Sequence, residues 1–114
     1  NDNYGHPVGD KVLQQVSAIL ATSLRQSDSL GRWGGEEFLI LLPQIHVVAA
    51  ASVAEKLRLA VYAADFGLRN PVTISLGVAE LREDESAGDW ITRADKALYL
   101  AKDRGRNQLA VASE

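Results

Sequence analysis

Hydrophobic positions in the first quarter of the chain recur at intervals of three and four residues. From residue 10 onward they form one apolar stripe, made of Val12, Leu13, Val16, Ile19, Leu20 and Leu24. This spacing places side chains on one face of a helix, so the stretch predicts an amphipathic helix with Asp10 at its beginning. An acidic residue at the start of a helix commonly caps it, and capping is the first interpretation of Asp10.

The following segment has the pattern of a β-hairpin. A Gly34-Gly35 pair separates a short segment ending in an aromatic residue from an apolar run at residues 38–42. Tight hairpin turns need positive φ angles, which glycine adopts without strain. Glu36 and Glu37 follow at once, and neighbouring strand residues point to opposite faces, so at least one carboxylate must face away from the core. Taken alone, such a pair is more often a solvated edge than a site of chemistry.

Later elements alternate between helix and strand. A second apolar stripe predicts a helix over residues 47–64, and strict alternation predicts a strand over residues 72–78. The second face of that strand carries small residues, which would let another element or a ligand approach the backbone. A third helix is predicted from a cap at Asp89 to a terminating Gly105, followed by a short strand at residues 108–112.

This order of elements indicates the fold class. Helix, hairpin, helix, strand, helix and short strand predict an α+β protein, a ferredoxin-like sandwich with a central sheet that includes antiparallel strands. In a complete unit of that kind the first strand is central. No strand precedes the first helix here, so we expect the central strand to belong to residues before Asn1. With 114 residues, the chain is predicted to form a single domain over residues 1–114, truncated at its N-terminus.

Composition narrows the classes of partner. The formal net charge of −3 provides no general basic field for nucleic acid, so any phosphate site must be local. The absence of cysteine excludes disulfides and thiolate metal sites. No apolar run approaches the roughly 20 residues of a membrane span. We therefore expect a cytoplasmic domain with no membrane contact of its own, cut from a longer polypeptide that could be tethered elsewhere.

Four blocks of the chain together resemble the GGDEF family of diguanylate cyclases, whose fold is like a nucleotide cyclase palm. They occur in the family's order and spacing over nearly the whole chain. The blocks are Asn1-Asp2-x-x-Gly5-His6-x-x-Gly9-Asp10, the signature Gly34-Gly35-Glu36-Glu37-Phe38, the strand Thr73-Ile74-Ser75-Leu76-Gly77-Val78-Ala79, and Ala94-Asp95-x-Ala97-Leu98-Tyr99-x-Ala101-Lys102-x-x-Gly105-Arg106-Asn107.

The resemblance implies that two GTP molecules condense to cyclic di-GMP with release of two pyrophosphates. Phosphoryl transfer depends on positioning and on neutralising phosphate charge, commonly through Mg²⁺ held by carboxylates. By analogy with the family, Glu36 is the expected Mg²⁺ ligand, with Mn²⁺ as an alternative metal, and also a candidate base for the attacking ribose hydroxyl. Glu37 is the second candidate for catalysis.

Substrate contacts are implied in the same way. Lys102 and Arg106 would meet the GTP phosphates, although basic residues at the end of a helix also simply complement its dipole. Asn1 and Asp10 resemble the residues that read the guanine edge. His6 lies in the same loop, and loop packing explains it equally well. The remaining substrate contacts would come from the backbone at Gly34 and Gly35.

Arg25-Gln26-Ser27-Asp28 matches the family's RxxD inhibitory motif, nine positions before Gly34. In the family this motif binds the product, and an arginine can contact phosphate through two hydrogen bonds and stack on guanine. The resemblance therefore implies an allosteric product site at Arg25 and Asp28.

One part of the family's pattern is absent. Its other metal-binding aspartate and a phosphate-contacting backbone segment lie before the position of Asn1, so we expect these 114 residues alone to bind metal poorly and not to cyclise GTP. Because each domain would hold one GTP, activity implies a homodimer, driven by a sensory or receiver module elsewhere in the protein. Two further functions stay open: a catalytically silent receptor for cyclic di-GMP, and a GTP-binding module that regulates a partner enzyme.

Overall fold

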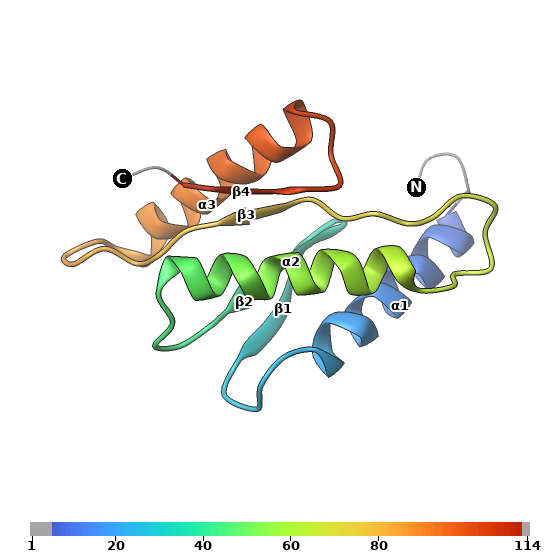
Figure 1. The fold of residues 1–114 in the computed structure, drawn as a ribbon, viewed down its shortest axis with the longest axis horizontal. Coiled ribbons are helices and arrows are strands. Elements are labelled where there is room, and N and C mark those ends of the chain that lie inside the picture. Colours follow the sequence, from blue (N-terminus) through green and yellow to red (C-terminus); the bar gives the residue numbers. More distant parts are fainter. Residues whose placement is uncertain (1–5, 113–114) are drawn as a thin grey trace.

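The computed structural model describes residues 6–112, which form three helices and four strands (Figure 1). In chain order these are α1 (His6–Thr22), β1 (Ser29–Gly34), β2 (Glu37–Leu41), α2 (Val47–Ala63), β3 (Leu76–Val78), α3 (Ala87–Asp103) and β4 (Leu109–Val111). The predicted α+β class is confirmed. Within the described residues, however, the strands form two separate pairs, β1 with β2 antiparallel and β3 with β4 parallel, instead of one continuous sheet.

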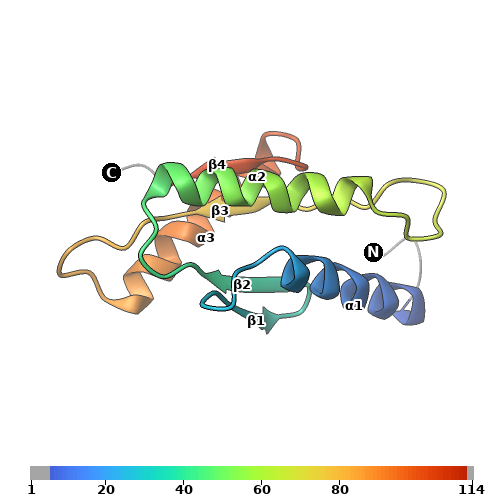
Figure 2. The same cartoon turned by 60° about the horizontal axis from the view of Figure 1, so that its bottom comes forward.

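The main core joins α1 and α2. Its buried residues are Val12, Val16, Leu20, Leu57 and Val61, and partly buried side chains from both strand pairs pack against them. Figure 2 shows α1 beside the β1–β2 hairpin and α2 lying along β3 and β4. Helix periodicity therefore identified the core face of both helices correctly.

The start of α1 differs from the prediction. The helix begins at His6, so Asp10 lies beyond its first turn and cannot be the N-terminal cap. The side chain of Asp10 is exposed. Since the capping interpretation does not hold, Asp10 is an exposed carboxylate on the second turn of the helix.

The predicted strand at residues 72–78 is hydrogen-bonded over only part of its length. Residues 76–78 pair with β4, and Leu76 N–H donates to Gln108 O at 3.0 Å. Val72 and Ile74 pack against the main core as the alternating pattern predicts. In the part of the chain that the structure describes, no strand pairs with residues 72–75, and the segment is therefore not counted as strand.

Gly77 on β3 allows α3 to pack directly on the strand backbone. A Cβ at this position would lie 2.9 Å from Leu98 Cα and closer still to Ala94 O and Leu98 N, all backbone atoms of α3. Real Cβ atoms do not approach backbone so closely, and the neighbouring atoms cannot rotate away. The prediction that small residues on this strand admit another element is confirmed, and that element is α3.

Both ends of α3 have defined caps. The N-cap is Ser86, whose Oγ accepts a hydrogen bond from Asp89 N–H at 3.1 Å, so the predicted cap at Asp89 is wrong and Asp89 lies in the first turn. At the other end, Gly105 has a φ of +122° and donates to Lys102 O at 3.3 Å. Arg106 N–H donates to Ala101 O at 3.0 Å, which completes a Schellman motif. The predicted termination at Gly105 is confirmed.

The loop before α3 is held to the helix by an ion pair. Arg93 contacts both carboxylate oxygens of Glu85, with Nε–Oε2 at 2.6 Å and Nη2–Oε1 at 2.7 Å. Arg82 N–H also donates to Glu85 Oε1 at 3.0 Å. These hydrogen bonds, that from the Arg93 side chain first, lower the pKa of Glu85 to about 2.

We expect this ion pair to make stability depend on acid pH. Because the folded-state pKa of Glu85 lies below its ordinary 4.5, the stabilisation is complete above pH 4.5 and is lost as pH falls toward 2. Glu85→Gln should therefore lower the melting temperature at neutral pH, and the difference from wild type should narrow between these two values. Melting curves across pH test this, with exposed Glu83→Gln as control. A difference in melting temperature between wild type and Glu85→Gln that stays constant across this pH range would contradict the prediction.

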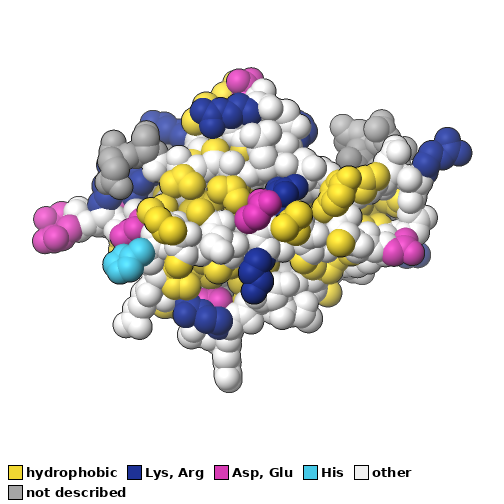
Figure 3. Space-filling view, in the orientation of Figure 1, with side chains coloured by type: hydrophobic (Ala, Val, Ile, Leu, Met, Phe, Trp, Pro, Cys, Tyr) yellow, Lys and Arg dark blue, Asp and Glu magenta, His cyan; other side chains and the backbone are white. Residues whose placement is uncertain are grey.

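The outer surface of α2 mixes apolar and charged side chains (Figure 3). Val48, Leu59 and Tyr62 are exposed there. Among the described residues, no helix is both long enough and apolar enough to cross a membrane.

Candidate functional site

The tip of the β1–β2 hairpin carries the signature residues. The turn consists of Gly35, with a φ of +51°, and Glu36, while Gly34 pairs with Glu37. The predicted hairpin is confirmed, but the turn is shifted by one residue, because only Gly35 has positive φ. Placing Glu36 within the turn leaves its carboxylate exposed, where it can meet a ligand.

Arg32, on β1, stabilises this turn through side-chain hydrogen bonds to its backbone. Its guanidinium donates to Gly35 O from Nε at 2.8 Å and from Nη2 at 2.5 Å. No role was predicted for Arg32 from the sequence. An arginine two residues before Gly34, on the strand entering a tight turn, was the available signal, because turn carbonyls need a donor.

The hairpin tip meets the C-terminal end of α3. Glu37 Oε2 lies 3.8 Å from Lys102 Nζ, and both side chains are partly exposed. Arg106 follows four residues after Lys102, in the segment that leads from α3 to β4, and it is exposed. The fold thus brings together a carboxylate of the signature and a cation of the last helix, 65 residues apart in the chain.

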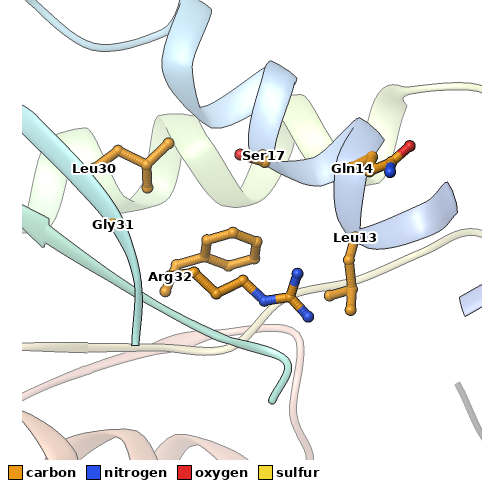
Figure 4. A pocket seen from close by; sticks show the side chains of 7 residues that line it. Leu13, Gln14, Ser17, Leu30, Gly31 and Arg32 are labelled. Carbon is orange, nitrogen blue, oxygen red and sulfur yellow. The ribbon is translucent and has the colours of Figure 1, made fainter. Parts of the chain in front are cut away.

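A cavity of about 290 Å³ opens beside the hairpin, close to the lower limit of roughly 300 Å³ for small-molecule pockets. It is lined by Leu13, Gln14 and Ser17 from α1, by Leu30, Gly31 and Arg32 from β1, and by Phe38 from β2 (Figure 4). Asp10 precedes Leu13 and Gln14 by three and four residues, which places it on the same side of α1. Leu13, which belongs to the predicted apolar stripe, lines this cavity.

Two predicted substrate contacts cannot be placed. Asn1 lies outside the described residues, and the side chain of His6, at the first position of α1, is also outside the described part. The remaining predicted substrate residues lie in three parts of the fold: Asp10 on α1, the glycines at the hairpin tip, and Lys102 in the last turn of α3 with Arg106 just after it.

Arg25 and Asp28 form a closed turn between α1 and β1. Arg25 Nη2 lies 2.8 Å from Asp28 Oδ1, and the backbone N–H of Arg25 donates to Asp28 Oδ2 at 2.8 Å. Arg25 also donates to Pro43 O at 3.2 Å. Hydrogen bonding to the Arg25 side chain lowers the pKa of Asp28. The Asp28 side chain is only 3% exposed, whereas that of Arg25 is 52% exposed.

This turn is well separated from the signature. It precedes Ser29, at the start of β1, and the hairpin tip follows Gly34 at the far end. Six strand residues at about 3.3 Å each make roughly 20 Å. A ligand on Arg25 would therefore occupy a second site.

The residues present suit Mg²⁺ in part. In the described part of the chain, no group of three or more His, Asp or Glu side chains is placed to hold a metal ion. Magnesium in phosphate-transfer sites commonly takes only one or two carboxylates, with substrate phosphates and water as its other ligands. The exposed Glu36 carboxylate at the hairpin tip fits that requirement.

Comparison with known proteins establishes the family. The family model described as "Diguanylate cyclase, GGDEF domain" matches residues 1–108, and the chain belongs to this family. Diguanylate cyclase A of Treponema denticola is 42% identical over 116 residues, which cover 98% of this chain and 31% of the relative. The chain thus spans about a third of that relative's length. GGDEF diguanylate cyclases are generally metal-dependent.

Two solved structures have the same fold. The active GGEEF domain of a diguanylate cyclase from Vibrio cholerae has a TM-score of 0.91 and 34% identity, covering all of this chain and 74% of that one. The GGDEF domain of DgcB from Caulobacter crescentus, solved in complex with c-di-GMP, has a TM-score of 0.93 and 32% identity, covering all of this chain and 70% of that one. The first of these carries the same Glu-Glu form of the signature in its name.

Proposed function

We propose that this chain is the catalytic domain of a diguanylate cyclase, which condenses two GTP molecules into cyclic di-GMP and two pyrophosphates. The observation that carries the proposal is the 3.8 Å approach of Glu37 to Lys102, which joins the signature hairpin to the cationic end of α3. Family membership and the cavity beside the hairpin support it.

Each residue has a chemical task in this reaction. The exposed Glu36 would hold Mg²⁺, whose charge when bound helps neutralise the phosphates, and it is a candidate to accept the proton of the attacking ribose hydroxyl. Glu37 is the second candidate base. Lys102 and Arg106 would bind the phosphate oxygens of GTP, holding the reacting phosphorus for attack as pyrophosphate leaves.

The base of GTP would enter the cavity between α1 and the hairpin. Asp10, about one turn before Leu13 and Gln14 on α1, would accept hydrogen bonds from the guanine edge, with Asn1 as its predicted partner. The tight turn at Gly35 would let the phosphates approach the backbone. Because one domain would hold one GTP, two copies must meet face to face, and we propose a homodimer as the active state.

We also propose that a further strand joins the two short sheets in the longer protein. The unpaired segment at residues 72–75, whose apolar side chains already pack on the core, supports this. Such a strand would bring the additional metal-binding aspartate that the resemblance implies. Assays of function should therefore use the full-length protein.

Arg25 and Asp28 are proposed to bind the product. The turn is already closed by hydrogen bonds, so the half-exposed guanidinium is oriented before any ligand binds. This feature also favours the second candidate function, a silent receptor for cyclic di-GMP. The presence of both signature carboxylates, Glu36 and Glu37, favours the catalytic function over the receptor function.

We expect Arg25→Ala to relieve product inhibition, because it removes the half-exposed guanidinium that is proposed to contact the product. The concentration of cyclic di-GMP that halves activity should rise at least about tenfold, corresponding to about 1.4 kcal/mol of lost binding. Initial rates with added product measure this, and exposed Arg69→Ala is the control. Unchanged inhibition in Arg25→Ala would remove the allosteric assignment.

The cyclase proposal is tested by incubating the full-length protein with GTP and Mg²⁺ and separating the products. We expect one cyclic di-GMP for every two pyrophosphates. If a folded dimer binds cyclic di-GMP but forms none, the receptor function replaces the enzyme. If it binds GTP alone without turnover, a GTP-binding regulatory module is the better interpretation.

A further inference from the structure

The segment between α3 and β4 adopts a costly backbone conformation. Arg106 and Asn107 have φ angles of +62° and +50°, directly after Gly105 at +122°. Left-handed conformations at two successive residues with side chains persist only where the surroundings enforce them. This segment includes Arg106, one of the two cations proposed to bind GTP phosphates, so what enforces it bears on the site.

Asn107 is fixed by contacts from two other elements. Its backbone N–H donates to Ser75 Oγ at 3.2 Å, and its side-chain Oδ1 accepts from Arg58 Nη1 at 2.9 Å. Ser75 lies just before β3 and Arg58 lies on α2, which is 49 residues away in sequence. Asn107 therefore connects the turn to the rigid part of the fold.

Arg58 is itself held in one orientation. Its Nε and Nη2 donate to the two oxygens of Glu55, at 2.8 and 2.6 Å, which leaves Nη1 directed to Asn107. The Arg58 side chain is only 17% exposed. A lysine could not make these three contacts, because they require the planar fork of a guanidinium.

We propose that Arg58 is a positioning residue for nucleotide binding: through Asn107 it fixes the left-handed turn that carries Arg106, four residues after Lys102. The inference rests on the proposed function. Arg58 does not contact the substrate. It holds the turn in one conformation before phosphates bind, and so lowers the conformational entropy that is lost on binding. Its removal should weaken GTP binding without removing any phosphate ligand.

The test uses the full-length protein and a non-hydrolysable GTP analogue with Mg²⁺. Arg58→Met keeps much of the aliphatic packing but removes the donors, and we expect the dissociation constant to rise at least about tenfold. Asn107→Ala should weaken binding similarly, and the double variant should bind no worse than the weaker single one, because both changes break the same contact. Asn107→Asp keeps an acceptor and should restore affinity.

Amide hydrogen exchange in the absence of nucleotide gives a second readout. Exchange at residues 105–108 should accelerate in Arg58→Met and stay at the wild-type rate in Lys56→Met, which removes an exposed cation from the same helix. Accelerated exchange with unchanged affinity would overturn the positioning role, as would additive effects in the double variant. If Arg58→Met does not fold, Asn107→Ala and Asn107→Asp test the same contact. Wild type that binds no analogue would instead refute the proposed function.

Discussion

Replacing Glu36 with alanine is expected to abolish measurable synthesis of cyclic di-GMP, a loss of at least roughly 10²–10³-fold. Glu36 stands in the hairpin turn with an exposed carboxylate, and alanine removes both the proposed Mg²⁺ ligand and a candidate base. The turn itself should survive, because Gly35 supplies its positive φ and Arg32 braces its carbonyl. Product formation from GTP by the full-length protein is the measurement.

The control for this variant is Glu83→Ala, which removes an exposed carboxylate from the loop before α3. We expect it to keep wild-type activity, and both variants to keep the wild-type melting temperature. Cyclic di-GMP synthesis by Glu36→Ala at near the wild-type rate would exclude Glu36 from the reaction and shift the search to Glu37.

We expect Gly77→Ala to lower the free energy of unfolding strongly, and far more than Gly31→Ala does. The new Cβ would collide with backbone atoms of Ala94 and Leu98, so relief requires that α3 move away from β3. Overpacking costs typically 1–3 kcal/mol and more where backbone must shift, and we expect about 3 kcal/mol or more. Denaturant unfolding of the purified protein measures this.

Gly31→Ala is the matched control, because Gly31 also lies in a strand, has no unusual φ, and has no atom within 4 Å of an added Cβ. Its stability should stay within about 0.5 kcal/mol of wild type. If Gly77→Ala unfolds at the same denaturant concentration as Gly31→Ala, the close packing of α3 on β3 is incorrect. Loss of that packing should also displace Lys102 from the hairpin.

The sequence predicted which helices and strands form better than it predicted the residues at which they begin and end. Apolar periodicity identified each helix because each buries one face, and Gly105 marked the end of α3 because a left-handed cap favours glycine. The earlier start of α1 had a signal in Pro7, which is tolerated in a first turn where its missing N–H has no partner to lose. The start of α3 was predicted three residues too late, at Asp89, because serine and aspartate both cap helices and Ser86 was not considered.

The length of β3 could not be predicted from its alternating pattern. Alternation reports which side chains are buried, and Val72 and Ile74 are indeed packed on the core. Hydrogen bonding depends instead on a neighbouring strand, which residues 72–75 lack within the described part of the chain.

The candidate site was inferred from resemblance to the family. Nothing in periodicity or composition relates Glu37 to Lys102, because their approach depends on how α3 packs against the strands. Arg32 and Arg58 were missed because neither belongs to a motif: Arg32 donates to the backbone carbonyl of Gly35, and Arg58 donates to the side chain of Asn107. The roles of Glu36, Arg106 and Asp10 stay predictions.

Binding of a non-hydrolysable GTP analogue to the full-length protein, with Mg²⁺ and measured by calorimetry, tests most directly whether nucleotide phosphates bind where the hairpin meets α3. We expect wild type and Lys96→Ala, which removes an exposed lysine elsewhere on the same helix, to bind equally well. Lys102→Ala should bind at least about tenfold more weakly, a loss of about 1.4 kcal/mol. Equal binding by Lys102→Ala and wild type would contradict a phosphate site at this junction.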